Sequence, residues 1–267
     1  MTLPKPGGVA GMGAGFGPAS APGSASGAGA DADAAATFCA TLVDEWRRHG
    51  VSHGVICPGS RSTPMAVALL LADRPRLSIT VRLDERGAAF FALGMALQSG
   101  RPAILLTTSG TAAAEVHAAV VEAHYARVPL IVCTADRPPE LRQVGAPQAI
   151  DQSGLFGRHV RFFADPGVPD WKVAGTWRSL GSRSVLEALA GPYGPGPVHL
   201  NLPFREPLMA RAADLPSPRP GGRPWHGVTR PRAVDQGAIA RLSDELRPER
   251  RGLIVAGGTW GASGASG

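Results

Sequence analysis

Three strand-like segments separated by helix-like sequence constrain the fold of this chain most strongly. They are a run rich in β-branched residues at 77–81 and apolar runs at 103–106 and 129–134. The last run is uninterrupted, as a strand of a parallel sheet buried on both faces requires. Sequence rich in small apolar residues fills the two intervals, at 88–97 and 112–126. The alternation predicts an α/β fold, with a mostly parallel sheet and helices on both faces.

The whole chain is expected to divide into four parts. Residues 1–33 are rich in Gly, Ala, Pro and Ser and are predicted to be a disordered tail. Residues 34–207 should form the α/β domain, followed at 208–232 by an interdomain linker rich in Pro, Arg and Gly. Residues 233–267 read as the start of a second α/β domain that is cut short, with a helix at 233–246 and a strand at 252–256. Further elements are predicted as helices at 34–48, 65–72 and 171–189 and as strands at 53–57, 160–164 and 197–202.

Composition argues against several classes of function. The net charge is +6, and all but two of the 27 basic residues are Arg, mostly single or paired along the chain. Without a basic block or an aromatic-interleaved stripe, nucleic-acid binding is disfavoured. The three cysteines, Cys39, Cys57 and Cys133, are far apart in apolar segments, which indicates buried reduced thiols in a cytoplasmic protein. No apolar stretch is long enough to span a bilayer, so no membrane association is expected.

Glu85 is the first candidate for chemistry. It follows the apolar segment 77–81 and should lie at the carboxyl end of a strand, where open α/β sheets bind ligands. An acid in this place most often caps the next helix or interacts with its dipole, and Asp84 would serve that purpose equally well. The sequence AAFF at 88–91 favours apolar surroundings, in which a carboxyl group could exchange a proton with a nitrogen heterocycle. We therefore treat Glu85 as a candidate cofactor-activating acid. Its protonation state is left open.

Two arginines, Arg61 and Arg137, also follow predicted strands and should share an edge with Glu85 if the sheet is parallel. A loop Arg is usually solvated, but two guanidinium groups together suit an acidic substrate. Ser60 could hydrogen-bond the same ligand, and Gln148 lies in a loop that could cover it.

Other chemistries have weaker support. His117, His124 and His159 lack metal-ligand spacing, so no metal site is predicted in this chain. Neither Ser60 nor Ser109 fits the G-x-S-x-G nucleophile elbow, which disfavours a serine hydrolase. Cys57 could be a nucleophile in principle, but a thiol buried in a strand is the preferred interpretation.

Four segments in this order resemble one known family. They are CPGSRSTP at 57–64, DERGAAFFALGMA at 84–96, TSGTAAAE at 108–115 and TADRPPELRQVGAPQAIDQSGLFG at 134–157. They are similar to the pyrimidine-binding domain of 2-succinyl-5-enolpyruvyl-6-hydroxy-3-cyclohexene-1-carboxylate synthase, a thiamine diphosphate-dependent enzyme family of menaquinone biosynthesis. The resemblance covers about residues 34–207. Pro147 and Glu115 depart from the family, which often has Asn at each position.

The resemblance implies a cofactor, a reaction and roles for particular residues. Thiamine diphosphate would bind across a subunit interface of a homodimer or homotetramer, with Glu85 hydrogen-bonding the pyrimidine ring and helping to activate the cofactor. The enzyme would decarboxylate 2-oxoglutarate and add the remaining four-carbon unit to isochorismate. The family's other cofactor contacts are matched by Pro58, Ser109 and Gly110. Its contacts to the acidic substrates are matched by Ser60, Arg61, Arg137 and Gln148.

One part of the family pattern is missing from this chain. The family holds Mg²⁺ and the diphosphate in a later domain, through a Gly-Asp-Gly motif and a downstream Asn. No Gly-Asp-Gly occurs here, and Asn201 is the only asparagine. We therefore expect the chain to supply at most half of each active site and to be inactive alone. Two alternatives stay open: a non-catalytic module that only pairs with a partner, and another thiamine diphosphate-dependent decarboxylase or synthase of the acetolactate-synthase type.

Overall fold

A six-stranded sheet forms the centre of the computed structural model, which describes residues 27–72, 77–191, 193–227 and 236–245. Every neighbouring pair of strands is parallel, in the order β2-β1-β3-β4-β6-β5. The strands are β1 (His53–Ile56), β2 (Ser78–Val81), β3 (Ala103–Thr107), β4 (Leu130–Asp136), β5 (Phe162–Ala164) and β6 (Pro197–Pro203). The prediction of an α/β fold with a mostly parallel sheet is confirmed.

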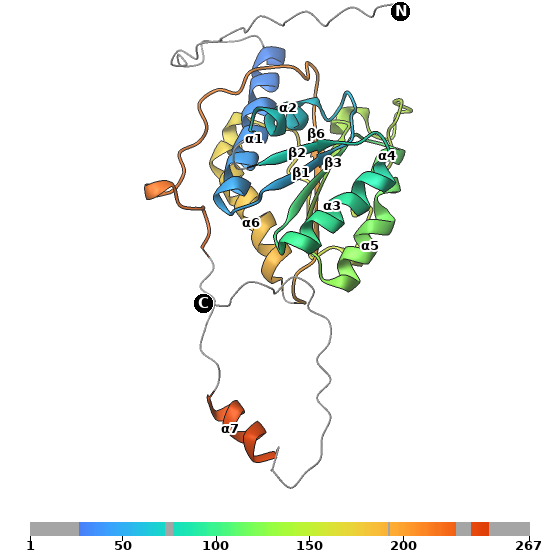
Figure 1. Ribbon diagram of the computed structural model, residues 1–267. Helices are drawn as coiled ribbons and strands as arrows, with labels where there is room; N and C mark the ends of the chain where they lie inside the picture. Colours follow the sequence, from blue (N-terminus) through green and yellow to red (C-terminus); the bar gives the residue numbers. More distant parts are fainter. Residues whose placement is uncertain (1–26, 73–76, 192, 228–235, 246–267) are drawn as a thin grey trace, which may run out of the picture.

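Helices cover both faces of this sheet (Figure 1). The α-helices are α1 (Gly27–Arg48), α2 (Thr63–Leu71), α3 (Glu85–Ser99), α4 (Thr111–Glu115), α5 (His117–Ala126), α6 (Trp177–Ala190) and α7 (Gln236–Glu245). Helices α1, α2 and α6 share one core cluster with the sheet, and α3 and α5 share the other. Short 3₁₀ turns lie at Pro139–Leu141, Gly157–His159, Trp171–Thr176 and Pro220–Gly222.

The segments 103–106 and 129–134 correspond to the central strands β3 and β4, whereas 77–81 corresponds to the edge strand β2, whose residues are exposed or half-buried. Every residue of β3, β4 and β6 is buried. Successive side chains of a strand point to opposite faces, so Ile104 and Leu106 pack against the α1 side while Leu105 packs against the α3 side. A strand that is covered on both faces needs apolar residues at both its odd and its even positions. The sequence of such a strand therefore shows no alternation of apolar and polar residues.

Several element boundaries differ from those predicted. Helix α1 begins at Gly27, so the prediction of a disordered tail is wrong for residues 27–33. The reason is tertiary packing. Ala32, Ala34 and Ala35 are buried against the rest of the domain, and alanine has the highest intrinsic helix propensity of all residues. The predicted helix at 112–126 is divided at Val116 into α4 and α5. Residues 1–26 and the predicted strand at 252–256 lie outside the described residues.

Residues 205–227, here called the strap, overlap the predicted linker from residue 208 onwards but are hydrogen-bonded to the domain. The backbone N–H of Ala213 donates to Thr37 Oγ1 (2.9 Å) and that of Trp225 donates to Glu45 Oε1 (2.5 Å), both on α1. On α6, the Arg178 guanidinium donates to the Pro216 carbonyl (2.5 Å). The strap therefore covers α1 and α6. The division of the chain into domains stays a prediction.

Candidate active site

A cleft of about 610 Å³ opens at the carboxyl edge of the sheet. Its walls come from segments that follow β1, β2, β3, β4 and β6, which is the edge where open α/β sheets bind ligands. Six of the sequence-predicted site residues line this one cleft: Pro58, Ser60, Arg61, Glu85, Arg137 and Gln148. The two arginines therefore lie at the same edge as Glu85, as expected for a parallel sheet.

Asp84 and Glu85 are adjacent, but only one of them caps α3. The Asp84 carboxylate accepts a hydrogen bond from the Gly87 backbone N–H at 2.7 Å, as an N-cap residue does. Glu85 is the first residue of α3 and is half-buried in the cleft wall. Among the described residues, no hydrogen bond or ion pair reaches its carboxylate. The geometry thus gives the capping role to Asp84 and leaves the Glu85 carboxylate available to a ligand.

Cys57 directly follows β1 and precedes the cleft residue Pro58. Its thiol is buried and protonated. Burial raises the pKa of Cys57 to about 12, and the nearby charges of Glu85 and then Asp84 act in the same direction. A thiol needs its thiolate form to act as a nucleophile. The structure therefore gives no support to Cys57 as a nucleophile and agrees with the prediction of a buried thiol. Cys39 and Cys133 are buried free thiols as well.

Two guanidinium groups face the cleft in different states. Arg61 is 8% exposed and is already bound: it donates to the Phe204 carbonyl and to Glu206 Oε1, each at 3.0 Å. Arg137 donates to the Ser109 hydroxyl. Partial burial, and then the charge of Arg61, lower the pKa of Arg137, although an Arg keeps its proton at neutral pH. Glu206 already pairs with Arg61, whereas no ion pair reaches Arg137 among the described residues, so the Arg137 guanidinium favours an acidic ligand.

Two glycines shape the cleft floor. A side chain on Gly59 would collide with Thr108, so the loop after β1 lies directly against the turn after β3. Gly110 has φ +83°, a conformation that favours glycine, and a side chain there would also meet Gln148. Ser109 and Gly110 are buried and do not line the cleft. Their predicted contact with a cofactor stays a prediction.

Sequence reasoning missed two carboxylates of the cleft, Glu115 and Glu206. Glu115 ends α4, and Glu206 lies just beyond β6 and pairs with Arg61. Glu206 could have been predicted from its position in the sequence, because it follows the last predicted strand as Arg137 follows an earlier one. Among the described residues, no group of three His, Cys, Asp or Glu side chains is arranged to hold a metal ion. None of the described helices is long and apolar enough to cross a membrane.

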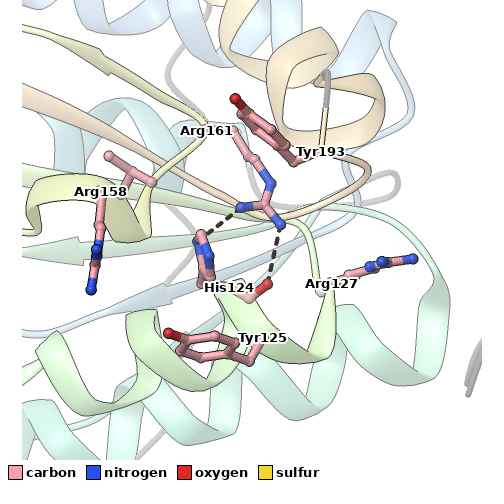
Figure 2. Close-up of a pocket in the computed structure, with 7 residues that line it drawn as sticks. His124, Tyr125, Arg127, Arg158, Arg161 and Tyr193 are labelled. Atoms are coloured by element: carbon pink, nitrogen blue, oxygen red, sulfur yellow. Dashed lines mark hydrogen bonds between the residues drawn. The ribbon is translucent and has the colours of Figure 1, made fainter.

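A second hollow, of about 520 Å³, lies at the opposite edge, among residues that mostly precede β4, β5 and β6 (Figure 2). In this view Arg161 extends between Tyr193 and His124, with its guanidinium directed at His124. That guanidinium donates to the His124 carbonyl (3.1 Å) and lies 2.8 Å from His124 Nδ1. No sequence-predicted site residue lines this hollow. The candidate active site is therefore the cleft at the carboxyl edge.

Comparison with known proteins identifies the domain that carries the cleft. Residues 36–155 match the family described as thiamine pyrophosphate enzyme, N-terminal TPP binding domain. These residues belong to that family. Most of the cleft lies within the thiamine pyrophosphate enzyme domain, since the lining residues from Pro58 to Gln148 fall inside the match and only Glu206 and Leu208 lie beyond it.

Individual relatives of this thiamine pyrophosphate enzyme domain share one name. The chain is 47% identical over 223 residues to the 2-succinyl-5-enolpyruvyl-6-hydroxy-3-cyclohexene-1-carboxylate synthase of Bacillus velezensis, and 51% identical over 222 residues to that of Chloroflexus aurantiacus. Each match covers 82% of this chain but only 38% and 37% of the relative. The synthase of Thermobifida fusca is 54% identical over 186 residues, or 69% of this chain and 32% of the relative. The chain thus spans well under half the length of these curated relatives.

Proposed function

We propose that this chain forms the pyrimidine-binding part of a 2-succinyl-5-enolpyruvyl-6-hydroxy-3-cyclohexene-1-carboxylate synthase. The reaction would decarboxylate 2-oxoglutarate and add the remaining four-carbon unit to isochorismate, in the cytoplasm and as a step of menaquinone biosynthesis. The identity to three synthases of that name supports the proposal. The observation that carries it is the Glu85 carboxylate, which has no hydrogen-bond or ion-pair partner among the described residues, in a cleft that also holds Arg61 and Arg137.

The residues of the cleft fit one end of thiamine diphosphate. Because Asp84 caps α3, the Glu85 carboxylate has no competing partner among the described residues and can hydrogen-bond a ring nitrogen. When bound, thiamine diphosphate would supply the nucleophilic carbon that permits loss of carbon dioxide from a 2-oxo acid. No group of three His, Cys, Asp or Glu side chains among the described residues is arranged to hold a metal ion. From the resemblance, we propose that the metal and the diphosphate are held by protein outside them, across the interface of a homodimer or homotetramer.

The chain's own side chains would do two further tasks. Glu85 would hold or transfer a proton at the ring nitrogen of the cofactor, in a wall that half-buries it. Arg61 and Arg137 would bind the carboxylates of the substrates, since paired guanidinium groups recognise carboxylates in fixed geometry. Ser60 and Gln148, on the same cleft, would orient them.

The test is a chimera, because the chain spans only part of its relatives. Residues 34–227 replace the matching segment of the Bacillus velezensis enzyme, and condensation of 2-oxoglutarate with isochorismate is measured. We expect the chimera to be active. We expect Glu85→Gln to lower kcat by about 10² to 10⁴ fold, the typical contribution of a positioned acid or base.

Glu115→Gln is the matched control, because Glu115 lines the same cleft without the proposed role. It should retain kcat within about threefold, far from the loss expected of a residue that transfers a proton. Unchanged turnover in Glu85→Gln would reject the role of Glu85. A preference for pyruvate would favour the acetolactate-synthase type. A folded chimera without any turnover would favour the non-catalytic module.

A further inference from the structure

A buried amide, that of Gln152, joins three segments beneath the cleft. Gln152 is 1% exposed, and its Oε1 accepts a hydrogen bond from the Gly110 backbone N–H at 2.8 Å. Its Nε2 donates to the Ala135 carbonyl (3.1 Å) and to Asn201 Oδ1 (2.8 Å). The orientation of this amide is fixed by its partners, because the reverse would place donor against donor at Gly110. Gln152 thus links the turn after β3 to the ends of β4 and β6.

The connection continues through Asn201 to the backbone of Arg137. Asn201 Nδ2 donates to Asp136 Oδ2 at 2.8 Å, and the other oxygen of Asp136 accepts from the Arg137 backbone N–H at 2.7 Å. Thr134 completes the set by donating to Asn201 Oδ1 at 2.9 Å. Apart from Arg137 itself, all these residues are nearly inaccessible to solvent. Buried polar groups in which each capacity is used hold one arrangement firmly, because any change leaves an unpaired group in the interior.

The side chain of Arg137 is hydrogen-bonded to the same turn that Gln152 holds. Its guanidinium donates to the hydroxyl of Ser109, which is the residue before Gly110. Gln148 also donates to the Ser109 carbonyl at 3.1 Å. Both side chains that cover the cleft floor are therefore held by the Ser109–Gly110 turn, and Gln152 holds that turn from below. Arg137 is fixed at its backbone by Asp136 and at its guanidinium by Ser109, with Gln152 between the two anchors.

We infer that Gln152 is a positioning residue for Arg137, acting through the Ser109–Gly110 turn and through Asn201 and Asp136. It does not line the cleft. Without its amide, the Gly110 N–H loses its acceptor and Asn201 loses one of its two donors. The turn that holds the Arg137 guanidinium then relaxes, whereas Arg142 still holds Asp136 (2.8 Å) and the Arg137 carbonyl (3.1 Å). The consequence for ligand binding rests on the proposed function, whereas the consequence for the Arg137 guanidinium does not.

The direct test is ¹⁵N NMR of arginine side chains in the full chain. Rotation of the Arg137 guanidinium should be slow in the wild type and fast in Gln152→Met, which keeps the side-chain length and removes the amide. The Arg137 signals are assigned from their loss in Arg137→Lys. Ser184→Ala is the matched control, because it also removes a buried hydrogen-bonding group, the partner of Trp46 Nε1, on the other side of the sheet. It should leave the Arg137 signals unchanged.

Binding of 2-oxoglutarate, measured by calorimetry on the chimera carrying the same substitutions, tests the consequence. Gln152→Met should weaken affinity about tenfold, in the range expected when a buried hydrogen bond is lost. In an Arg137→Lys background the same change should add less than about twofold, because residues acting through one group are not additive. Additive losses would overturn the inference.

Two further outcomes separate the inference from the proposed function. Fast rotation of Arg137 in the wild type, or slow rotation retained in Gln152→Met, would overturn the inference whether or not a ligand binds. Absence of 2-oxoglutarate binding by the unsubstituted chimera would count against the proposed function alone. If Gln152→Met does not fold, hydrogen exchange of the Gly110 amide in the wild type decides: exchange as fast as in exposed loops would contradict its bond to Gln152.

Discussion

Two adjacent carboxylates, Asp84 and Glu85, show how much one residue's place in a helix decides. Both are acids at the same helix start, and the sequence could assign either of them to the cap. In the structure Asp84 accepts the Gly87 N–H, so the next residue is left with its carboxylate on the cleft. The distinction depends on one backbone angle pair at Asp84, which has the extended conformation of an N-cap (φ −99°, ψ 120°).

His199 predicts a pH dependence of stability. It lies on β6 with no exposed surface, and its Nε2 is 2.8 Å from Thr134 Oγ1. Because the Thr134 hydroxyl donates to Asn201, Nε2 carries the hydrogen. Burial lowers the pKa of His199 to about 3. Below pH 6.5 the unfolded chain therefore binds a proton that the folded chain does not, so the free energy of unfolding falls as pH decreases from about 6.5 towards 3.

The His199→Phe variant should lose this component. Between pH 7.5 and 4.5, the wild type should lose about 2 to 3 kcal/mol more free energy of unfolding than the variant, measured by urea denaturation at both values. The cost of the substitution itself appears at pH 7.5, where His199 is neutral in both states, and is subtracted. Parallel pH curves for the two proteins would show that a proton enters this site in the folded chain.

The site residues differ in how far sequence could predict them. Arg61, Glu85 and Arg137 each come soon after an apolar strand, and parallel strands end at one edge, so their common cleft was predictable. Gln152 and Asn201 were not. They are 49 residues apart, and they meet only because β4 pairs with β6 rather than with the strand next in the chain. Strand order is set by tertiary packing and cannot be predicted from the hydrophobic pattern of individual segments.

At the scale of elements, the same distinction applies. The central strands were predictable because burial on both faces leaves an unbroken apolar run in the sequence. The start of α1 was not, since residues 27–33 contain only Gly, Ala and Asp, and their helix depends on neighbours such as Arg205, which donates to Asp31 at 3.0 Å. The break between α4 and α5 also lacked a local signal, because no Gly or Pro occurs there.

The packing of α1 on α6 includes a buried ion pair that should matter for stability. Arg178 on α6 donates to Glu45 Oε2 at 2.9 Å and to Asp44 Oδ2 at 2.8 Å on α1. The side chains of Arg178 and Glu45 are 2% and 0% exposed. Replacing Arg178 with Met leaves the Glu45 carboxylate buried without its cation. We expect a loss of about 3 to 5 kcal/mol in the free energy of unfolding, measured by denaturant titration.

Arg183→Met serves as the control on the same helix. Arg183 is 58% exposed and forms an i,i+4 pair with Glu187. Exposed pairs of this kind contribute little, so the variant should lose less than about 1 kcal/mol. Equal losses in the two variants would mean that the charge of Glu45 is compensated by another group.

At the scale of the whole molecule, the strap should be part of the folded unit. Its backbone provides partners to Thr37, Glu45 and Arg178, which are buried side chains of α1 and α6. A chain of residues 1–204 should therefore be less stable than one of residues 1–227, by at least about 3 kcal/mol, given roughly 1 kcal/mol for each of several hydrogen bonds. Thermal and urea unfolding of the two chains measures the difference. Equal stability would assign residues 205–227 to a linker that merely rests on the domain.

The strand order also has a consequence for synthesis on the ribosome. Strand β6 lies between β4 and β5, yet it is the last of the six to be made. Until it emerges, β5 has no neighbour and β4 presents one open side of unsatisfied peptide groups beside an apolar sequence. Such an open side invites pairing with other nascent chains. Polypeptides released before residue 197 should thus be the most prone to aggregate, and a molecular chaperone would be needed mainly during that interval.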